Sequence, residues 1–245
     1  MAELGSKALF DGRTPRAVFF DFDGTLAVLN IDFPAMRRTV IEILHRYGVL
    51  REDLTAPYVL EMIAEGTRVI AARDQEKARL FHGEAFEAVR EIELEAAAKG
   101  ELLPGARGVL TALRLKGVKT AVLTRNCTAA VERVFPDVRD LLDVVITRDD
   151  TPLVKPDPYH LRRAMAALGC GASRGVMVGD HPMDITMGRR VGLKTVGVLS
   201  GTADEGQLRE AGAEAVIADL RDLLPLVSID HESTAKGFDD RNRLW

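Results

Sequence analysis

AVFFDFDGTL, residues 17–26, is the stretch of sequence that decides the fold. Its first four residues are apolar and rich in β-formers, a pattern typical of a strand buried on both faces of a parallel sheet. The apolar run ends at Phe20 and is followed by two acidic residues, Asp21 and Asp23, and then by Gly24. Two carboxylates at a spacing of two on extended chain point the same way, so their repulsion implies a bound cation, a shared proton, or both.

The rest of the chain shows two kinds of pattern. Residues 33–99 have helical periodicity without a strand pattern. Beyond residue 105, helices and strands alternate, with helices predicted at 106–116, 128–135, 158–168, 183–191 and from 204, and strands at 118–123, 144–147, 175–178, 195–198 and 215–218. Such alternation predicts an α/β fold with a doubly wound parallel sheet.

The position of the helical stretch divides the chain. We predict a Rossmann-like core formed by residues 1–28 and 103–226, and an all-helical cap domain, residues 29–102, inserted after the first strand. Residues 227–245 lack periodicity and are predicted to form a flexible tail. Within the insert, the run 84–99 is rich in Ala and Glu, which is typical of an exposed helix face with i,i+4 pairs such as Glu95 with Lys99.

Composition excludes several classes of protein. The 245 residues carry 33 Lys and Arg against 37 Asp and Glu, a net charge of −4, so there is no basic field to attract nucleic acid or an anionic membrane. Apolar runs are far shorter than the roughly 20 residues that span a bilayer. Cys127 and Cys170 fit neither a disulfide framework nor a zinc site. We therefore expect a cytoplasmic protein with reduced thiols, and leave its oligomeric state open.

Polar side chains follow four of the predicted strands, where a parallel sheet places its ligand crevice. After the first strand come Asp21 and Asp23, and the later strands are followed by Thr124, Arg125 and Asn126, by Lys155, and by Asp180, His181 and Asp184. Carboxylates are the ligands that Mg²⁺ prefers, whereas an ammonium and a hydroxyl suit a phosphoryl group. An Asp can attack phosphorus while a second carboxylate transfers protons. The pattern predicts a phosphate-handling site.

These motifs, taken in order, resemble those of the haloacid dehalogenase (HAD) superfamily: DFDGTL at 21–26, the strand-end Thr124, Lys155 followed by Pro, and VGD at 178–180 with Asp184. The position of the insert resembles the C1-capped branch, which includes phosphoglycolate phosphatases. The resemblance covers residues 16–226. It implies that Asp21 is the nucleophile and Asp23 the general acid/base, while Thr124 and Lys155 bind the phosphoryl group.

The same resemblance implies a Mg²⁺ ion. Its ligands would be the Asp21 carboxylate, the Asp23 backbone carbonyl and Asp180, with Asp184 acting through a bound water or by orienting Lys155. We further assign to substrate contact Arg125 and Asn126 of the second motif, and Arg68 of the insert. The second motif reads Thr-Arg-Asn where phosphoglycolate phosphatases commonly have Thr-Asn, which leaves the natural substrate open.

The function predicted from the sequence is a Mg²⁺-dependent phosphatase that forms an aspartyl-phosphate and acts on a small phosphorylated metabolite, phosphoglycolate or a sugar phosphate. Two alternatives stay open: a sugar-phosphate mutase, which needs the same motifs, and a non-catalytic binding module on this fold. A dehalogenase or phosphonate hydrolase fits less well, because those relatives lack the second acid that is present here as Asp23.

Overall fold

The computed structural model describes residues 9, 10 and 14–227. Its main sheet has six parallel strands in the order β5-β4-β1-β6-β7-β8, which confirms the predicted α/β class. The strands are β1 (Ala17–Phe20), β4 (Lys119–Leu123), β5 (Val144–Ile146), β6 (Gly175–Gly179), β7 (Lys194–Val198) and β8 (Ala215–Ile217). The decisive first strand therefore lies in the middle of the sheet, between β4 and β6.

Helices cover both faces of this sheet. They are α4 (Ala106–Leu115), α5 (Thr128–Val134), α6 (Val138–Leu141), α7 (Pro158–Leu168), α8 (Pro182–Arg190), α9 (Glu205–Glu210) and α10 (Leu223–Val227). Because successive side chains of a strand point to opposite faces, β1 contributes to two cores. Val18 and Phe20 pack in one cluster with Leu110 of α4, whereas Phe19 packs in the other with Leu161 of α7.

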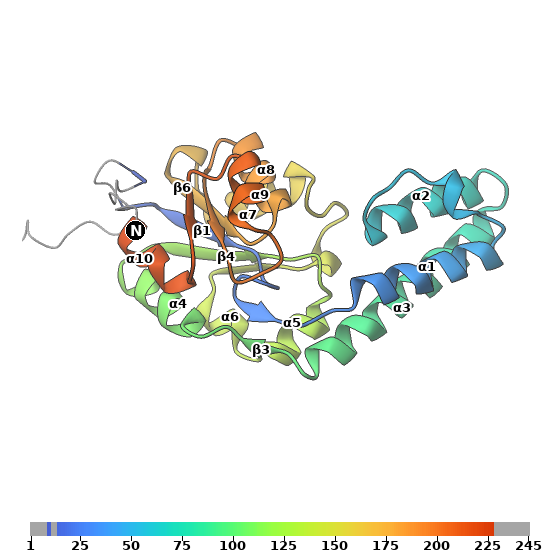
Figure 1. Cartoon of the computed structure of the whole chain (residues 1–245), viewed down its shortest axis with the longest axis horizontal. Helices are drawn as coiled ribbons and strands as arrows, with labels where there is room; N and C mark the ends of the chain where they lie inside the picture. Colours follow the sequence, from blue (N-terminus) through green and yellow to red (C-terminus); the bar gives the residue numbers. More distant parts are fainter. Residues whose placement is uncertain (1–8, 11–13, 228–245) are drawn as a thin grey trace, which may run out of the picture.

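Three helices form the insert: α1 (Phe33–Arg46), α2 (Val59–Ala71) and α3 (Gln75–Ala97). Figure 1 shows them together on one side of the sheet, with α1 and α3 running away from it. Their apolar faces meet through fully buried side chains, among them Val40 and Leu44 of α1, Ile63 of α2 and Phe81 of α3. Two short segments that the sequence analysis did not predict, β2 (Ala27–Val28) and β3 (Glu101–Leu102), pair antiparallel where the chain enters and leaves the insert.

The predicted division into a core (1–28 and 103–226) and a cap domain (29–102) stays a prediction. The predicted tail lies outside the described residues, apart from Val227, which is buried and ends α10.

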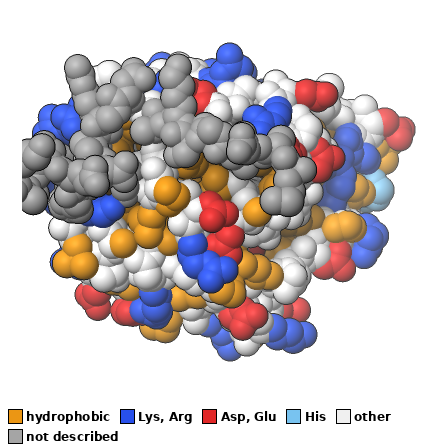
Figure 2. Space-filling model, turned by 60° about the vertical axis from the view of Figure 1, so that its left-hand side comes forward, with side chains coloured by type: hydrophobic (Ala, Val, Ile, Leu, Met, Phe, Trp, Pro, Cys, Tyr) orange, Lys and Arg blue, Asp and Glu red, His pale blue; other side chains and the backbone are white. Residues whose placement is uncertain are grey.

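The described surface carries both signs of charge. On the face shown in Figure 2, acidic and basic side chains are interspersed among apolar ones. None of the helices within residues 9–10 and 14–227 is long and apolar enough to cross a membrane. Cys127 and Cys170 are free and buried.

Candidate active site

A buried lysine lies between two carboxylates at the carboxyl edge of the sheet. Lys155 Nζ is 2.6 Å from Asp21 Oδ1 and 2.8 Å from Asp184 Oδ1. Asp21 directly follows β1 and Asp184 lies in the first turn of α8, so the parallel strands deliver these groups to one point. Burial by itself lowers the pKa of Lys155, but Asp184 and Asp21 outweigh it and the pKa is raised. Lys155 is therefore a fixed positive charge.

Three carboxylates cluster around this point. Oxygen atoms of Asp21, Asp180 and Asp184 lie within 4.8 Å of one another. Burial raises the pKa of Asp180 to about 6, with a further contribution from the charge of Asp21, and the same two causes raise the pKa of Asp184 well above its usual value. Asp184 Oδ2 is buried and has no hydrogen-bond partner among the described residues. An unpaired buried carboxylate oxygen beside two other carboxylates fits a hard divalent cation.

A glycine makes room for this cluster. Gly24 has a φ of +82°, and a Cβ at this position would lie 2.5 Å from Cγ of Asp180. A side chain here would therefore be strained and would also displace the carboxylate. The Asp180 side chain is held in turn by hydrogen bonds from the Thr202 N–H at 3.2 Å and from the Thr25 hydroxyl at 3.4 Å.

Asp23 lies beside the cluster in a different environment. Its Oδ1 accepts a hydrogen bond from the Leu29 N–H at 2.9 Å. Burial raises the pKa of Asp23 to about 6, although the bond from Leu29 lowers it and Asp21 raises it further. A carboxyl group with a pKa near neutrality can both donate and accept a proton. Its environment thus suits the acid/base role that the resemblance implies.

The loop that carries Lys155 is fixed by a histidine that the sequence analysis did not single out. His160 of α7 is fully buried, its Nδ1 accepts from the Lys155 N–H at 3.3 Å, and its Nε2 lies 3.3 Å from the Ile146 carbonyl. Burial lowers the pKa of His160 to about 4, so the ring is neutral and Nε2–H donates to Ile146. Asp157 caps the same helix by accepting a hydrogen bond from the Tyr159 N–H at 2.8 Å.

Three residues after β4, Thr124, Arg125 and Asn126, have different contacts. Thr124 is buried, and its Oγ1 accepts from the Asn126 N–H at 3.1 Å, which leaves the hydroxyl proton to donate. Asn126 Nδ2 is buried without a hydrogen-bond partner among the described residues. Arg125 instead reaches the insert: its Nη1 and Nη2 each lie 2.7 Å from a carboxylate oxygen of Glu61 in α2.

Two other sequence-predicted candidates are also placed by the structure. Arg68 lies on α2 beyond Glu61, is exposed, and its Nε donates to the Ala64 carbonyl of its own helix at 3.4 Å. His181 caps α8 through Nδ1, which accepts from the Met183 N–H at 3.1 Å. Its ring also packs edge-on against Tyr58 of the insert, with centroids 6.3 Å apart. Burial lowers the pKa of His181, so its ring is an uncharged contact between the two parts of the chain.

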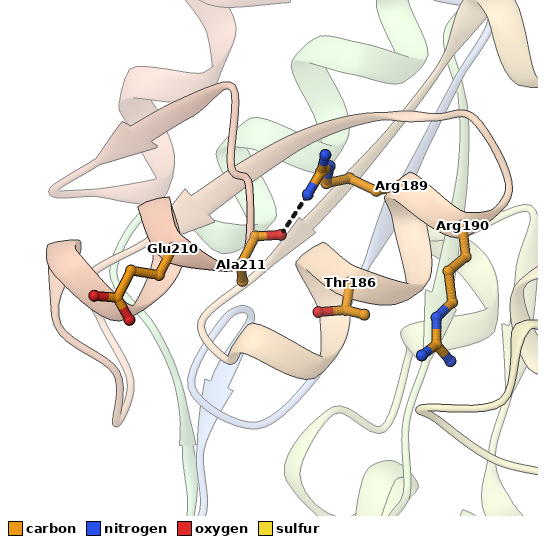
Figure 3. Close-up of a pocket in the computed structure, with 5 residues that line it drawn as sticks. All are labelled: Thr186, Arg189, Arg190, Glu210 and Ala211. Carbon is orange, nitrogen blue, oxygen red and sulfur yellow. Dashed lines mark hydrogen bonds between the residues drawn. The ribbon is translucent and has the colours of Figure 1, made fainter.

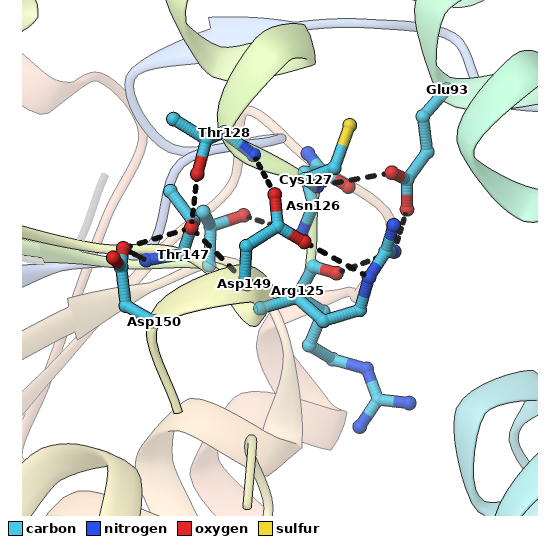
Figure 4. A network of polar contacts seen from close by, with 10 residues as sticks. Glu93, Arg125, Asn126, Cys127, Thr128, Thr147, Asp149 and Asp150 are labelled. Carbon is cyan, nitrogen blue, oxygen red and sulfur yellow. Dashed lines mark hydrogen bonds and ion pairs between the residues drawn. The ribbon is translucent and has the colours of Figure 1, made fainter. Parts of the chain in front are cut away.

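A second ion pair, between Glu93 and Arg148, is buried and contacts the loop after β4 (Figure 4). Glu93 of α3 lies 2.5 Å from Nη1 of Arg148, and its other oxygen accepts from the Cys127 N–H at 3.0 Å. Arg148 also donates to the Arg125 carbonyl at 3.1 Å. The expectation that residues 84–99 form an exposed face is therefore wrong at Glu93, which is 3% exposed. Burial and the neighbouring Glu93 raise the pKa of Cys127 to about 11, so this thiol stays protonated.

A surface hollow lies elsewhere, on α8 and α9 (Figure 3). It is lined by Thr186, Arg189, Arg190, Glu210 and Ala211. Arg189 Nη1 donates to the Ala211 carbonyl at 3.2 Å across it. The lining shares no residue with the acidic cluster, so the hollow is separate from the candidate site.

Comparison with known proteins identifies the family of the chain. Residues 15–192 match the family model of haloacid dehalogenase-like hydrolases. A phosphoglycolate phosphatase of Pseudomonas fluorescens is 31% identical over 240 residues, covering 90% of this chain and 83% of the relative. A phosphoglycolate phosphatase (plasmid) of Cupriavidus necator is 29% identical over 86% of this chain and 93% of the relative. The crystal structure of a predicted phosphoglycolate phosphatase from Haemophilus somnus shares the fold, with a TM-score of 0.59, 18% identity, and coverage of 87% of this chain and 98% of that one.

Proposed function

Because this chain belongs to the haloacid dehalogenase-like hydrolase family, we propose that it is a Mg²⁺-dependent phosphatase that hydrolyses a small phosphate monoester through an aspartyl-phosphate. The observation that carries the proposal is Lys155, buried between Asp21 and Asp184 beside the orphaned oxygen of Asp184. The Lys155 ammonium can bind a phosphoryl group, and the three carboxylates beside it can bind a cation that neutralises the charge of that group.

In the proposed reaction, Asp21 attacks phosphorus and the ester P–O bond breaks. Asp21 Oδ1 already accepts from the Phe22 N–H and faces Lys155 Nζ, each at 2.6 Å, which leaves Oδ2 to attack. Asp23 protonates the departing oxygen, then takes a proton from the water that attacks the phosphorylated Asp21 and releases phosphate. Asp21, Asp180 and the Asp23 carbonyl would hold Mg²⁺, which would supply positive charge to neutralise the phosphoryl oxygens. Asp184 holds Lys155 in place throughout.

Addition of Mg²⁺ is expected to activate phosphate release from an aryl phosphate and to raise the melting temperature. The reason is that oxygens of Asp21, Asp180 and Asp184 lie within 4.8 Å of one another, and the single positive charge of Lys155 offsets only part of their repulsion. Ca²⁺ should inhibit, because its larger and more flexible coordination shell misplaces the nucleophile. Phosphate release and thermal unfolding measured in Mg²⁺, Ca²⁺ and EDTA test this expectation. Full activity after dialysis against EDTA contradicts it.

Asp23→Asn is expected to impair alkyl phosphates far more than aryl phosphates in the step that phosphorylates the enzyme. An aryl oxide leaves with little protonation, whereas an alkoxide needs the proton that Asp23 supplies. Rapid-quench measurement of phosphoenzyme formation with both ester types, compared with the wild type, separates the two. Equal losses on both would remove Asp23 from the acid/base role.

The proposed substrate is phosphoglycolate or a sugar phosphate, and the proposed location is the cytoplasm, without a nucleic-acid partner. Two relatives that are named phosphoglycolate phosphatases support the first choice. The sugar-phosphate mutase remains the second candidate, and it differs in the acceptor of the phosphoryl group. Release of inorganic phosphate in proportion to substrate consumed supports the hydrolase, while conversion of one sugar phosphate isomer into another without release supports the mutase.

A further inference from the structure

The ion pair between Arg125 and Glu61 joins the proposed phosphoryl site to the helical insert. Arg125 follows Thr124 directly along the chain, and its guanidinium donates a hydrogen bond to the Lys155 carbonyl, so it lies next to one of the two residues assigned to the phosphoryl group. On its other side it forms a two-pronged pair with Glu61, at 2.7 Å for both contacts. Its side chain is 21% exposed and that of Glu61 is 33% exposed. The pair is therefore partly accessible to solvent.

The guanidinium has supports that do not depend on Glu61. Besides the Lys155 carbonyl, it stacks over the Tyr58 ring at 5.4 Å from the centroid, and Met183 Sδ lies 4.0 Å from Nη1. A planar guanidinium held in this way presents its two N–H edges to any carboxylate of the right geometry. Glu61 is a partly solvated carboxylate, and such pairs exchange at little cost.

We propose that Glu61 occupies on Arg125 the place of a substrate carboxylate, so that the enzyme selects short phosphate esters that carry a carboxylate group. This inference rests on the proposed phosphatase function and assigns the residues that would distinguish a carboxylate-bearing substrate from the other phosphate esters. Phosphoryl transfer takes place at Asp21, and the carboxylate at the far end of the same small molecule displaces Glu61 from Arg125. Arg125 is thus a residue that determines specificity, and Glu61 is its internal competitor.

The test compares 2-phosphoglycolate with ethyl phosphate, two-carbon esters that differ in the carboxylate. Arg125→Gln is expected to lower kcat/KM for 2-phosphoglycolate by about 10- to 100-fold, the loss that follows from removing a charge-assisted hydrogen-bonded pair. The loss for ethyl phosphate should be several-fold smaller, since this ester has no carboxylate and only the hydrogen bond from Arg125 to the Lys155 carbonyl is lost. Inorganic phosphate should inhibit the variant as it does the wild type, which checks that the phosphoryl site is intact.

Arg107→Gln is the matched control. Arg107 of α4 also makes a two-pronged pair, with Asp137, and also lies over an aromatic ring, that of Phe135. It has no contact with Thr124 or Lys155 among its described interactions. Arg107→Gln should leave the ratio of kcat/KM for 2-phosphoglycolate and ethyl phosphate unchanged. If Arg125→Gln lowers kcat/KM for 2-phosphoglycolate and for ethyl phosphate by the same factor, or lowers neither, the proposal is overturned.

Glu61→Gln tests the competition directly. It keeps the shape of the side chain and removes its charge, so the KM for 2-phosphoglycolate should fall by several-fold while that for ethyl phosphate does not. A KM for 2-phosphoglycolate that is unchanged or raised overturns the displacement of Glu61. Calorimetric titration of the Asp21→Asn protein, with and without Arg125→Gln, measures the carboxylate preference without turnover. If the wild type releases no phosphate from any ester, the proposed function fails, and this titration still decides the inference.

Discussion

Asp21→Asn is expected to lower kcat by more than about 1,000-fold and to abolish the phosphorylated form of the protein. An amide oxygen is a poor nucleophile toward phosphorus, and removal of a covalent nucleophile leaves only the contributions of binding and electrostatics. The substitution also removes a negative charge that faces Lys155 at 2.6 Å. Steady-state phosphate release gives kcat, and mass spectrometry after acid quench detects the phosphorylated protein.

Asp74→Asn is the control for this substitution. Asp74 caps α3 by accepting from two backbone N–H groups, a task that Asn performs equally well. This variant should keep wild-type activity. Retention of even a tenth of the wild-type activity by Asp21→Asn would show that another group attacks phosphorus.

Arg148→Met is expected to destabilise the protein by about 3–5 kcal/mol, the usual cost of leaving one member of a buried ion pair without its partner. The side chains of Arg148 and Glu93 are only 7% and 4% exposed, so water cannot replace the lost contact. Urea denaturation followed by circular dichroism gives the free energy of unfolding.

A double substitution identifies the cause. Glu93→Leu together with Arg148→Met removes both charges and should be less destabilising than Arg148→Met alone, because no unpaired carboxylate stays buried. Arg221→Met, which breaks an exposed pair with Asp219, is the surface control and should have little effect. If Arg148→Met is no more harmful than this control, the pair contributes nothing to stability.

The central part of the site could be predicted because the topology enforces it. Once β1, β4 and β6 are recognised as parallel neighbours, their carboxyl ends must meet, so Asp21 and Asp180 have to come close together. Lys155 can join them because the loop that carries it lies at the same edge of the sheet. Nothing in the local sequence, in contrast, indicates that Glu61 pairs with Arg125, since the two lie 64 positions apart and the contact depends on how α2 faces the sheet.

The burial of Glu93 could have been predicted from the periodicity of its helix. The buried positions of α3 include Phe81, Ala85, Val89, Glu93 and Ala97, a row with a spacing of four residues along one helix face. Glu93 therefore occupies an apolar row, and a charge there implies a buried partner. Composition suggested a solvated helix instead, because the run 84–99 carries five Glu together with one Arg and one Lys. The identity of the partner, Arg148, follows only from the packing of α3 against the loops that follow β4 and β5.

The central place of β1 has a consequence for how the chain is made. Val18 pairs with Thr120 and Val176, which leave the ribosome about 100 and about 160 residues later. The helices between them contact one another locally and can fold while synthesis continues. Until then the four apolar residues of β1 have no neighbouring strand. They form an aggregation-prone segment that must be shielded until the second half of the chain emerges. Nascent chains arrested before β6 should therefore depend on chaperones far more than the finished protein does.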